Sequence, residues 1–363
     1  MTFFNPAKVR ARAVDHLAVA IGTSKGLFLV SDGTVDGPFF AGEAVGAFDQ
    51  VDGRFLAGGT AQGGKAVVRG SDDDGLTWKD LGPLPKAGED DITAVSQLHV
   101  DRRSEVPRTY WVGTEPAALL RSDDDGESFT VVDGLFEHPD RPRWPAGGCG
   151  LVLHSILTDP KRPDRVVVAV STGGVYRSED GGETWTACNQ GLESGVKLGN
   201  ESGLCVHKLA PDAVNPDFFW AQTHSGIYRT EDAGDHWESV GHVDEPGGLP
   251  FEFGFPVVAH PEETATAYVV PLESEKYSCT PGRCRVYRTT NGGQNWEGLS
   301  DGLPGTDAYL TVLRDALTIG AMAPYPIVFG SKSGHVFASQ DGGDYWRVVT
   351  SYLPPVLCVR VLD

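Results

Sequence analysis

The chain has 363 residues, and its 50 acidic and 30 basic side chains give a net charge of −20 at neutral pH. This charge argues against nucleic acids and anionic membrane surfaces as partners. The 46 glycines, the 24 prolines and the lack of sustained helical periodicity favour short strands joined by turns, so an all-β fold is expected. The first residues lack an apolar run long enough for a signal peptide, and no later stretch could span a bilayer, which predicts a cytoplasmic protein.

A short turn pattern recurs along the chain. It reads Ser/Thr-x-Asp/Asn-x-Gly-x-x-aromatic and occupies residues 71–78, 122–129, 178–185, 230–237, 289–296 and 339–346. The hydroxyl and carboxylate are expected to accept hydrogen bonds from backbone N–H groups, and the glycine to adopt a positive φ. The third positions recur at intervals of 51, 56, 52, 59 and 50 residues. A period of this size indicates a propeller or a solenoid.

Each repeat is interpreted as four antiparallel strands, with the turn pattern between the third and the fourth. The predicted blades span residues 44–82, 92–134, 149–188, 204–241, 255–299 and 309–352. Residues 16–23 and 26–31 are interpreted as two strands of a further blade, whose first strand comes from 355–362. Such closure by both termini hides the edges that an open array would expose. The sequence therefore predicts one domain, 1–363, folded as a seven-bladed β-propeller.

In a propeller, the first strands of the blades line a central channel, and function is expected at the loops on one of its faces. Aligning these strands places His154 and His207 at the same position in neighbouring blades, with Arg314 at that position in the last blade. By the two-residue period of a strand, Arg360 also faces the channel. We interpret His154, His207 and Arg314 as catalytic residues and Arg360 as a substrate-binding residue. The alternative is that they line a water-filled channel without a chemical role.

Further residues are candidates for binding a substrate. Ser96 or Gln97 aligns with the two histidines in the 92–134 blade, and Gln97 is assigned to binding. Trp144, flanked by arginines, could stack on a sugar or an aromatic ring, or it could equally fix its own loop. Tyr309 is the remaining aromatic candidate.

A metal site is a further hypothesis. His224 lies in a tight turn near His207, and three histidines, His154, His207 and His224, could bind one divalent transition metal with a position left open for substrate. Without a metal, the same imidazoles could act as general acid and base near neutral pH.

Two carboxylates, Glu252 and Glu273, precede and follow strands of the 255–299 blade. A pair of carboxylates can hydrolyse a glycosidic bond, and their separation decides between retention and inversion. The alternative is that both are simply solvated, as loop glutamates usually are. Cys279 and Cys284 could pair or bind metal, although two thiols make only half a zinc site.

The repeated turn resembles the Asp-box, or BNR repeat, of sialidases, other glycoside hydrolases, sortilin-type receptors and photosystem assembly propellers. Phrases along the whole chain are similar to bacterial BNR-repeat proteins labelled sialidase-like or glycosyl hydrolase-like: 22–28, 141–144, 205–209, 253–256, 270–274, 308–315 and 353–355. The resemblance implies that the box sits on the outer turn of each blade and that the protein is hydrolase-like. Sialidases share an Arg-Ile-Pro motif that this chain lacks, so sialidase activity is not expected.

Together these features predict a monomeric hydrolase-like enzyme, or a binder of a small molecule or glycan, with a polar pocket in the central channel. The alternative is a non-catalytic scaffold that binds another protein through its loops, which would require a sizeable exposed apolar patch.

Overall fold

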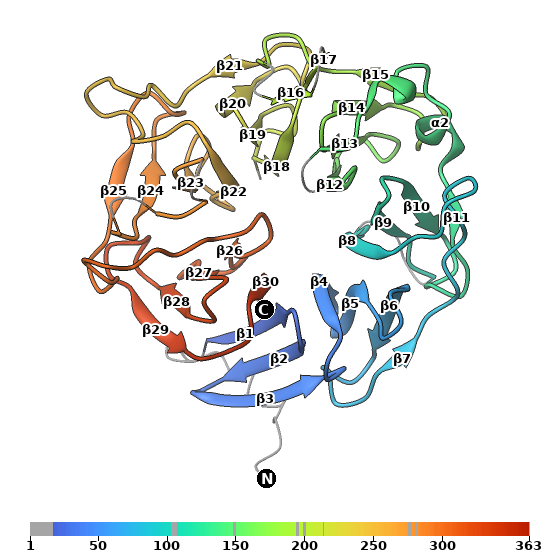
Figure 1. Cartoon of the computed structure of the whole chain (residues 1–363), viewed down its shortest axis with the longest axis horizontal. Helices are drawn as coiled ribbons and strands as arrows, with labels where there is room; N and C mark the ends of the chain where they lie inside the picture. The colour runs from blue at the N-terminus through green and yellow to red at the C-terminus, as the bar shows by residue number, and fades with distance from the viewer. Residues whose placement is uncertain are drawn as a thin grey trace. The chain divides into compact units, whose positions relative to one another are not determined.

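The computed structural model describes residues 17–102, 107–147, 150–193, 196–198, 201–212, 214–274, 277–279 and 282–362. These residues form seven four-stranded antiparallel sheets, the blades of a seven-bladed β-propeller (Figure 1). None of the helices in these ranges is long and apolar enough to cross a membrane. The predicted all-β propeller of four-stranded blades is confirmed.

The blades follow one another along the chain. They are β4 (Ala44–Val51), β5 (Arg54–Thr60), β6 (Ala66–Ser71) and β7 (Lys79–Asp80); β8 (Ala94–Val100), β9 (Tyr110–Glu115), β10 (Leu119–Ser122) and β11 (Thr130–Val131); β12 (Leu153–Thr158), β13 (Val166–Val170), β14 (Gly174–Ser178) and β15 (Thr186–Ala187); β18 (Val206–Pro211), β19 (Phe219–Thr223), β20 (Gly226–Thr230) and β21 (Glu238–Ser239); β22 (Gly254–Ala259), β23 (Ala267–Pro271), β24 (Val286–Thr289) and β25 (Glu297–Leu299); β26 (Leu317–Ile319), β27 (Ile327–Gly330), β28 (Val336–Ser339) and β29 (Arg347–Thr350). Outside the blades lie the hairpin β16 (Val196–Leu198) and β17 (Glu201–Gly203), helix α2 (Asp133–Phe136) and the 3-10 turn Arg141–Arg143.

The remaining blade combines both ends of the chain. Its strand order is β3 (Thr34–Phe39), β2 (Gly26–Ser31), β1 (Ala18–Thr23) and β30 (Val356–Val361), so the C-terminal strand pairs with β1 (Figure 1). The predicted closure by both termini is confirmed. Strand β3 was not predicted, because the turn that precedes it departs from the repeat pattern.

By their internal contacts, the described residues divide into two compact units. The first contains the terminal blade, β22–β25 and β26–β29, and the second contains the other four blades apart from the start of β4. In the second unit, β5, β8, β12 and β18 pack side by side in that order, and in the first unit β26 packs against both β22 and β30. Each blade buries apolar side chains against its neighbours in the unit, and all five residues of β13 are buried.

The repeated turns have the predicted hydrogen bonds. In the turn after β14, the Gly182 N–H donates to Ser178 Oγ at 2.8 Å and the Thr184 N–H donates to Asp180 Oδ1 at 2.9 Å. Gly182 has φ 101°, which favours glycine. The same pair of bonds recurs in the turns that begin at Ser71, Ser122, Thr230, Thr289 and Ser339. Each turn therefore fixes the start of the fourth strand of its blade.

One predicted blade begins at the wrong residue. Its first strand was expected from Tyr309, but β26 comprises only Leu317–Ile319. The preceding residues form an irregular segment, in which the Ala308 N–H donates to the Gly282 carbonyl at 2.8 Å and the Leu310 carbonyl accepts from the Cys279 N–H at 3.0 Å. The backbone partners of this segment therefore come from a distant loop instead of from a neighbouring strand.

Candidate functional site

The two inner histidines occupy β-bulges. The register of β12 against β13 shifts between Leu153 and Ser155, and that of β18 against β19 shifts between Val206 and Lys208. The extra residues are His154 and His207, which are 4% and 2% exposed. A bulge redirects its side chain and is frequent beside functional sites. The predicted equivalence of the two histidines is confirmed.

His207 lies beside His224 and Cys205. His224 follows β19 in a tight turn, and its N–H donates to the Cys205 carbonyl at 3.0 Å. The imidazole centroids of His207 and His224 are 5.8 Å apart, and burial lowers the pKa of His224 below its ordinary value. Candidate ligand atoms of Cys205, His207 and His224 all lie within 4.8 Å of one another.

This trio has the chemistry of a transition-metal site. A thiolate and two neutral imidazoles are ligands that zinc and its neighbours accept, and three protein ligands leave a fourth position open. The sequence predicted correctly that His207 and His224 are neighbours. It proposed His154 as the third ligand, whereas in the structure the third candidate ligand beside these histidines is Cys205. His154 is not among the described residues whose candidate ligand atoms lie together, and whether it binds metal stays a prediction.

Gln97 and Trp144 are already engaged by neighbours. The Gln97 side chain is buried on β8, and its amide oxygen accepts from Lys208 Nζ at 3.2 Å. Trp144 is 6% exposed, and its indole N–H donates to Tyr176 Oη at 2.8 Å. This geometry fits the alternative in which Trp144 fixes its own loop.

The predicted carboxylates belong to the first unit. The Leu272 N–H donates to the Phe253 carbonyl at 2.8 Å, which extends the β22–β23 ladder by one bond. Glu252 directly precedes Phe253, and Glu273 directly follows Leu272, so the two glutamates are the next pair of residues along the antiparallel strands. Glu273 is half-buried and Glu252 is exposed. The ladder therefore brings the backbones of the two carboxylate residues next to each other.

Two stacked aromatic residues are linked to the backbone of Glu273. The ring of Phe255 stacks on Tyr277 with centroids 5.9 Å apart and an interplanar angle of 11°, and the Tyr277 N–H donates to the Glu273 carbonyl at 2.8 Å. Tyr277 is 46% exposed although Phe255 is buried. The guanidinium of Arg314 lies 4.9 Å from the Phe255 centroid. Arg314 therefore packs against the ring of Phe255. It lies in a turn before β26, although it was predicted to lie on the first strand of that blade.

Two further predicted residues also belong to the first unit. Tyr309 is 63% exposed in the irregular segment before β26. Arg360 lies on β30 opposite Ala20 and is partly buried. That these residues and the histidines line one channel stays a prediction.

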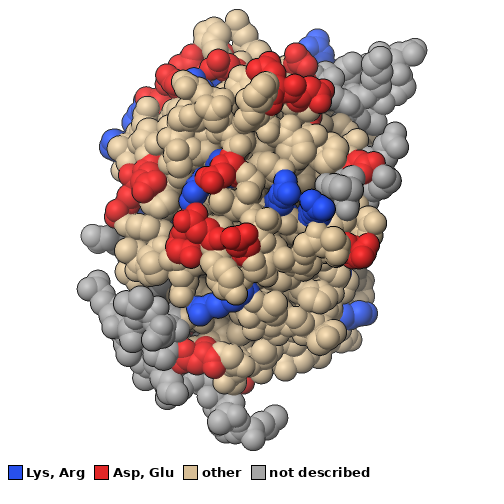
Figure 2. Space-filling view, turned by 90° about the vertical axis from the view of Figure 1, so that its left-hand side faces the viewer, with Lys and Arg blue, Asp and Glu red and all other residues tan. Residues whose placement is uncertain are grey.

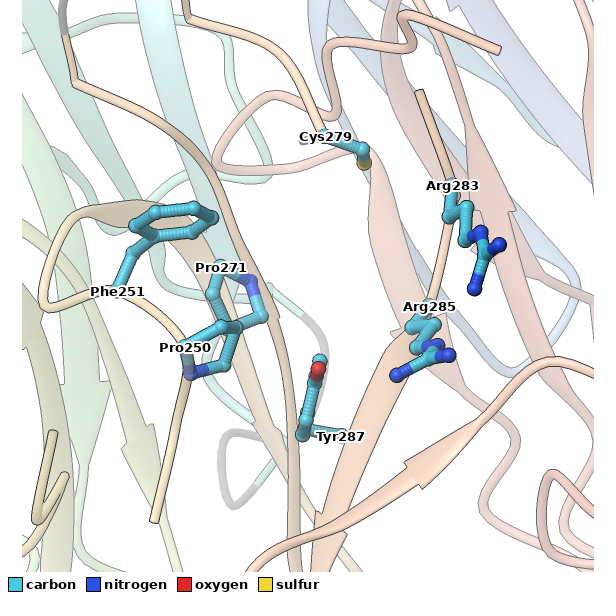
Figure 3. Close-up of a pocket in the computed structure, with 7 residues that line it drawn as sticks. All are labelled: Pro250, Phe251, Pro271, Cys279, Arg283, Arg285 and Tyr287. Carbon is cyan, nitrogen blue, oxygen red and sulfur yellow. The ribbon is translucent and has the colours of Figure 1, made fainter. Parts of the chain in front are cut away.

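The structure also contains a pocket that the sequence analysis missed. It has a volume of about 190 Å³ and is lined by Pro250, Phe251, Pro271, Cys279, Arg283, Arg285 and Tyr287 (Figure 3). Cys279 and Cys284 are free thiols with their Sγ atoms 3.8 Å apart, so they are not paired. The sequence signal that could have indicated this pocket is the alternation of polar and apolar residues from 283 to 287.

No protein-family model matches the chain. Among curated proteins, the chain is 27% identical over 174 residues to a xyloglucanase from Paenibacillus sp, covering 40% of this chain and 16% of the relative. It is 21% identical over 320 residues to an oligoxyloglucan-reducing end-specific xyloglucanase from Emericella nidulans, covering 77% of this chain and 37% of the relative. The chain thus spans well under half the length of the curated relatives that it matches.

Solved structures share the fold. A GH74 xyloglucanase from Xanthomonas campestris matches with a TM-score of 0.67 and 19% identity over 92% of this chain and 52% of the other. YCF48 bound to D1 peptide matches with a TM-score of 0.55 and 17% identity over 84% and 82% of the two chains. The expected similarity to glycoside hydrolases of the propeller fold is confirmed, whereas the sialidase-like and Asp-box assignments stay predictions.

Proposed function

We propose that the chain is a glycoside hydrolase-like enzyme that binds a glycan and cleaves it with a pair of carboxylates. The observation that supports this most is the sequence similarity to several xyloglucanases, which reaches 77% of the chain. Because a propeller fold hosts many activities, the assignment rests on this similarity together with the residues of the site.

Glu252 and Glu273 are the proposed catalytic pair. One carboxyl group would give its proton to the leaving oxygen, and the other would activate water or attack the sugar directly. Tyr277 is exposed next to Glu273 and is backed by the buried ring of Phe255, so it offers a rigid face on which a sugar can stack. Tyr309 is a second exposed aromatic residue for substrate contact.

The experiment measures the release of new reducing ends from xyloglucan oligosaccharides and other neutral glycans. We expect hydrolysis by the wild-type chain and a loss of at least about 100-fold in Glu252→Gln and Glu273→Gln, because each removes a proton donor or acceptor of the reaction. Glu89→Gln, an exposed carboxylate in the second unit, is the matched control. If the chain binds a glycan without hydrolysing it, the protein is a glycan binder and not an enzyme. If it neither binds nor hydrolyses any of these glycans, the proposal is contradicted and the protein-scaffold alternative remains.

We further propose that Cys205, His207 and His224 bind one divalent transition metal. Zinc or cobalt added to the purified chain, followed by dialysis and elemental analysis, should leave about one ion per chain. Cys205→Ser and His207→Ala should retain almost none, whereas His236→Ala, which alters an exposed histidine in a surface turn, should retain the wild-type amount. Equal retention by all variants, or none by the wild type, contradicts the site.

A further inference from the structure

The pocket lined by Arg283 and Arg285 has one cationic wall. Arg283, Arg285 and Tyr287 alternate with Cys284 and Val286, which are both 0% exposed. Arg283, Arg285 and Tyr287 all line the pocket, and strand β24 begins at Val286. The three polar residues therefore share the side that faces the pocket, while the residues between them anchor the segment in the core.

The opposite wall is apolar. Pro250 and Phe251 come from the connection before β22, and Pro271 ends β23. Figure 3 shows these three side chains on one side of the pocket and the two arginines on the other. The pocket therefore presents an apolar surface to one part of a ligand and two guanidinium groups to another.

Among the described residues, the two arginines lack the acidic partners that other arginines have. Arg288, on the same strand as Tyr287, pairs with Glu297 at 2.8 Å and with Asp344 at 3.1 Å. In the part of the chain that the structure describes, no ion pair involves Arg283 or Arg285. Because these guanidinium groups line the pocket without a carboxylate beside them, an anion supplied from solution would complete this wall.

The charge of the protein makes this arrangement selective. On the face in Figure 2, acidic side chains form several clusters and basic side chains are fewer, as the net charge of −20 requires. Such a surface repels anions in general. Two guanidinium groups that line one pocket, with no acidic partner in the described ranges, therefore mark a local site for negative charge.

We propose that this pocket binds a small organic anion, a carboxylate attached to a single six-membered ring. A guanidinium matches a carboxylate through two parallel hydrogen bonds, and the proline and phenylalanine side chains fit a ring. The volume of about 190 Å³ slightly exceeds the roughly 150 Å³ of an apolar cavity that binds benzene. This inference does not depend on glycan hydrolysis, because it concerns equilibrium binding by Arg283 and Arg285, although Phe251 and Pro271 of the pocket lie close in sequence to Glu252 and Glu273.

The test is isothermal titration of the full chain with benzoate and with D-glucuronate, which place the carboxylate on an aromatic ring or on a sugar ring. Saturable binding of either carboxylate supports the proposal. The ligand that binds more tightly shows whether the pocket prefers an aromatic ring or a sugar ring. Glucose, benzyl alcohol and inorganic phosphate are comparison ligands that lack the charge or the ring, and we expect each to bind at least tenfold more weakly.

Variants then locate the binding site. Arg285→Gln should weaken binding of the preferred carboxylate at least tenfold, and Arg283→Gln should weaken it as well, whereas Arg347→Gln removes an exposed charge elsewhere in the same unit and should have no effect. If Arg285→Gln fails to fold, Arg283→Gln and Phe251→Ala carry the test. No saturable binding of either carboxylate, tighter binding of phosphate, or equal binding by pocket and control variants would overturn the proposal.

Discussion

At the scale of residues, the repeated turns depend on charged oxygen acceptors. The hydroxyl and backbone N–H of Ser128 hold the pKa of Asp124 at about 2, below its ordinary value of 3.8. The same groups of Thr184 do so for Asp180, also to about 2. A carboxylate that is stabilised in this way favours the folded state above its unfolded pKa, and this contribution is lost as the pH falls through the folded pKa.

These two turns predict how stability depends on pH. The melting temperature of the wild-type chain should fall as the pH drops from about 4 to about 2. In the double variant Asp124→Asn, Asp180→Asn the fall should be shallower, since an amide oxygen accepts the same bonds without titrating. The chain supplies its own control, because Asn291 accepts from the Asn295 N–H at 3.1 Å in the equivalent turn. Parallel melting curves for wild type and variant would contradict this account.

The sequence alone could not identify every residue of the candidate metal site and the candidate substrate site. Cys205 lies just before β18 and gave no separate signal, because its proximity to His224 depends on the turn after β19. Trp144 illustrates the reverse case. Its flanking arginines suggested an exposed platform, but a partner 32 residues away, Tyr176, engages the indole.

At the scale of elements, sequence periodicity predicted the strands that carry local repeats. The third strand β14 (Gly174–Ser178) ends at Ser178, the first residue of the repeated turn that was predicted to follow it. The bulges in β12 and β18 could not be predicted, because an extra residue in one strand is recognised only when its pairing with the neighbouring strand is known. The segment before β26 was misinterpreted as a strand for a similar reason, as its apolar residues pair with a loop some 30 residues earlier.

At the scale of the whole molecule, the repeated turns predicted six blades, and the strand-like segments at the two ends of the chain predicted the seventh, shared blade. Pairing of β1 with β30 requires close approach at Gly22, where an added Cβ would lie 2.4 Å from both Cys358 Sγ and the Val45 carbonyl oxygen. Function was less predictable, because the repeats specify a fold that similar chains use both as a xyloglucanase and as YCF48 bound to D1 peptide. The loops and strand ends, not the repeats, carry the candidate sites.

The central claim is that a glycan binds where the ends of β22 and β23 bring Glu252 and Glu273 together. Amide hydrogen exchange of the Glu273→Gln variant, with and without a xyloglucan oligosaccharide, tests it most directly, because the substitution should preserve binding while preventing cleavage. We predict slower exchange in residues 251–254 and 271–274 when the oligosaccharide is present. Unchanged exchange in both segments at saturating oligosaccharide would contradict the claim.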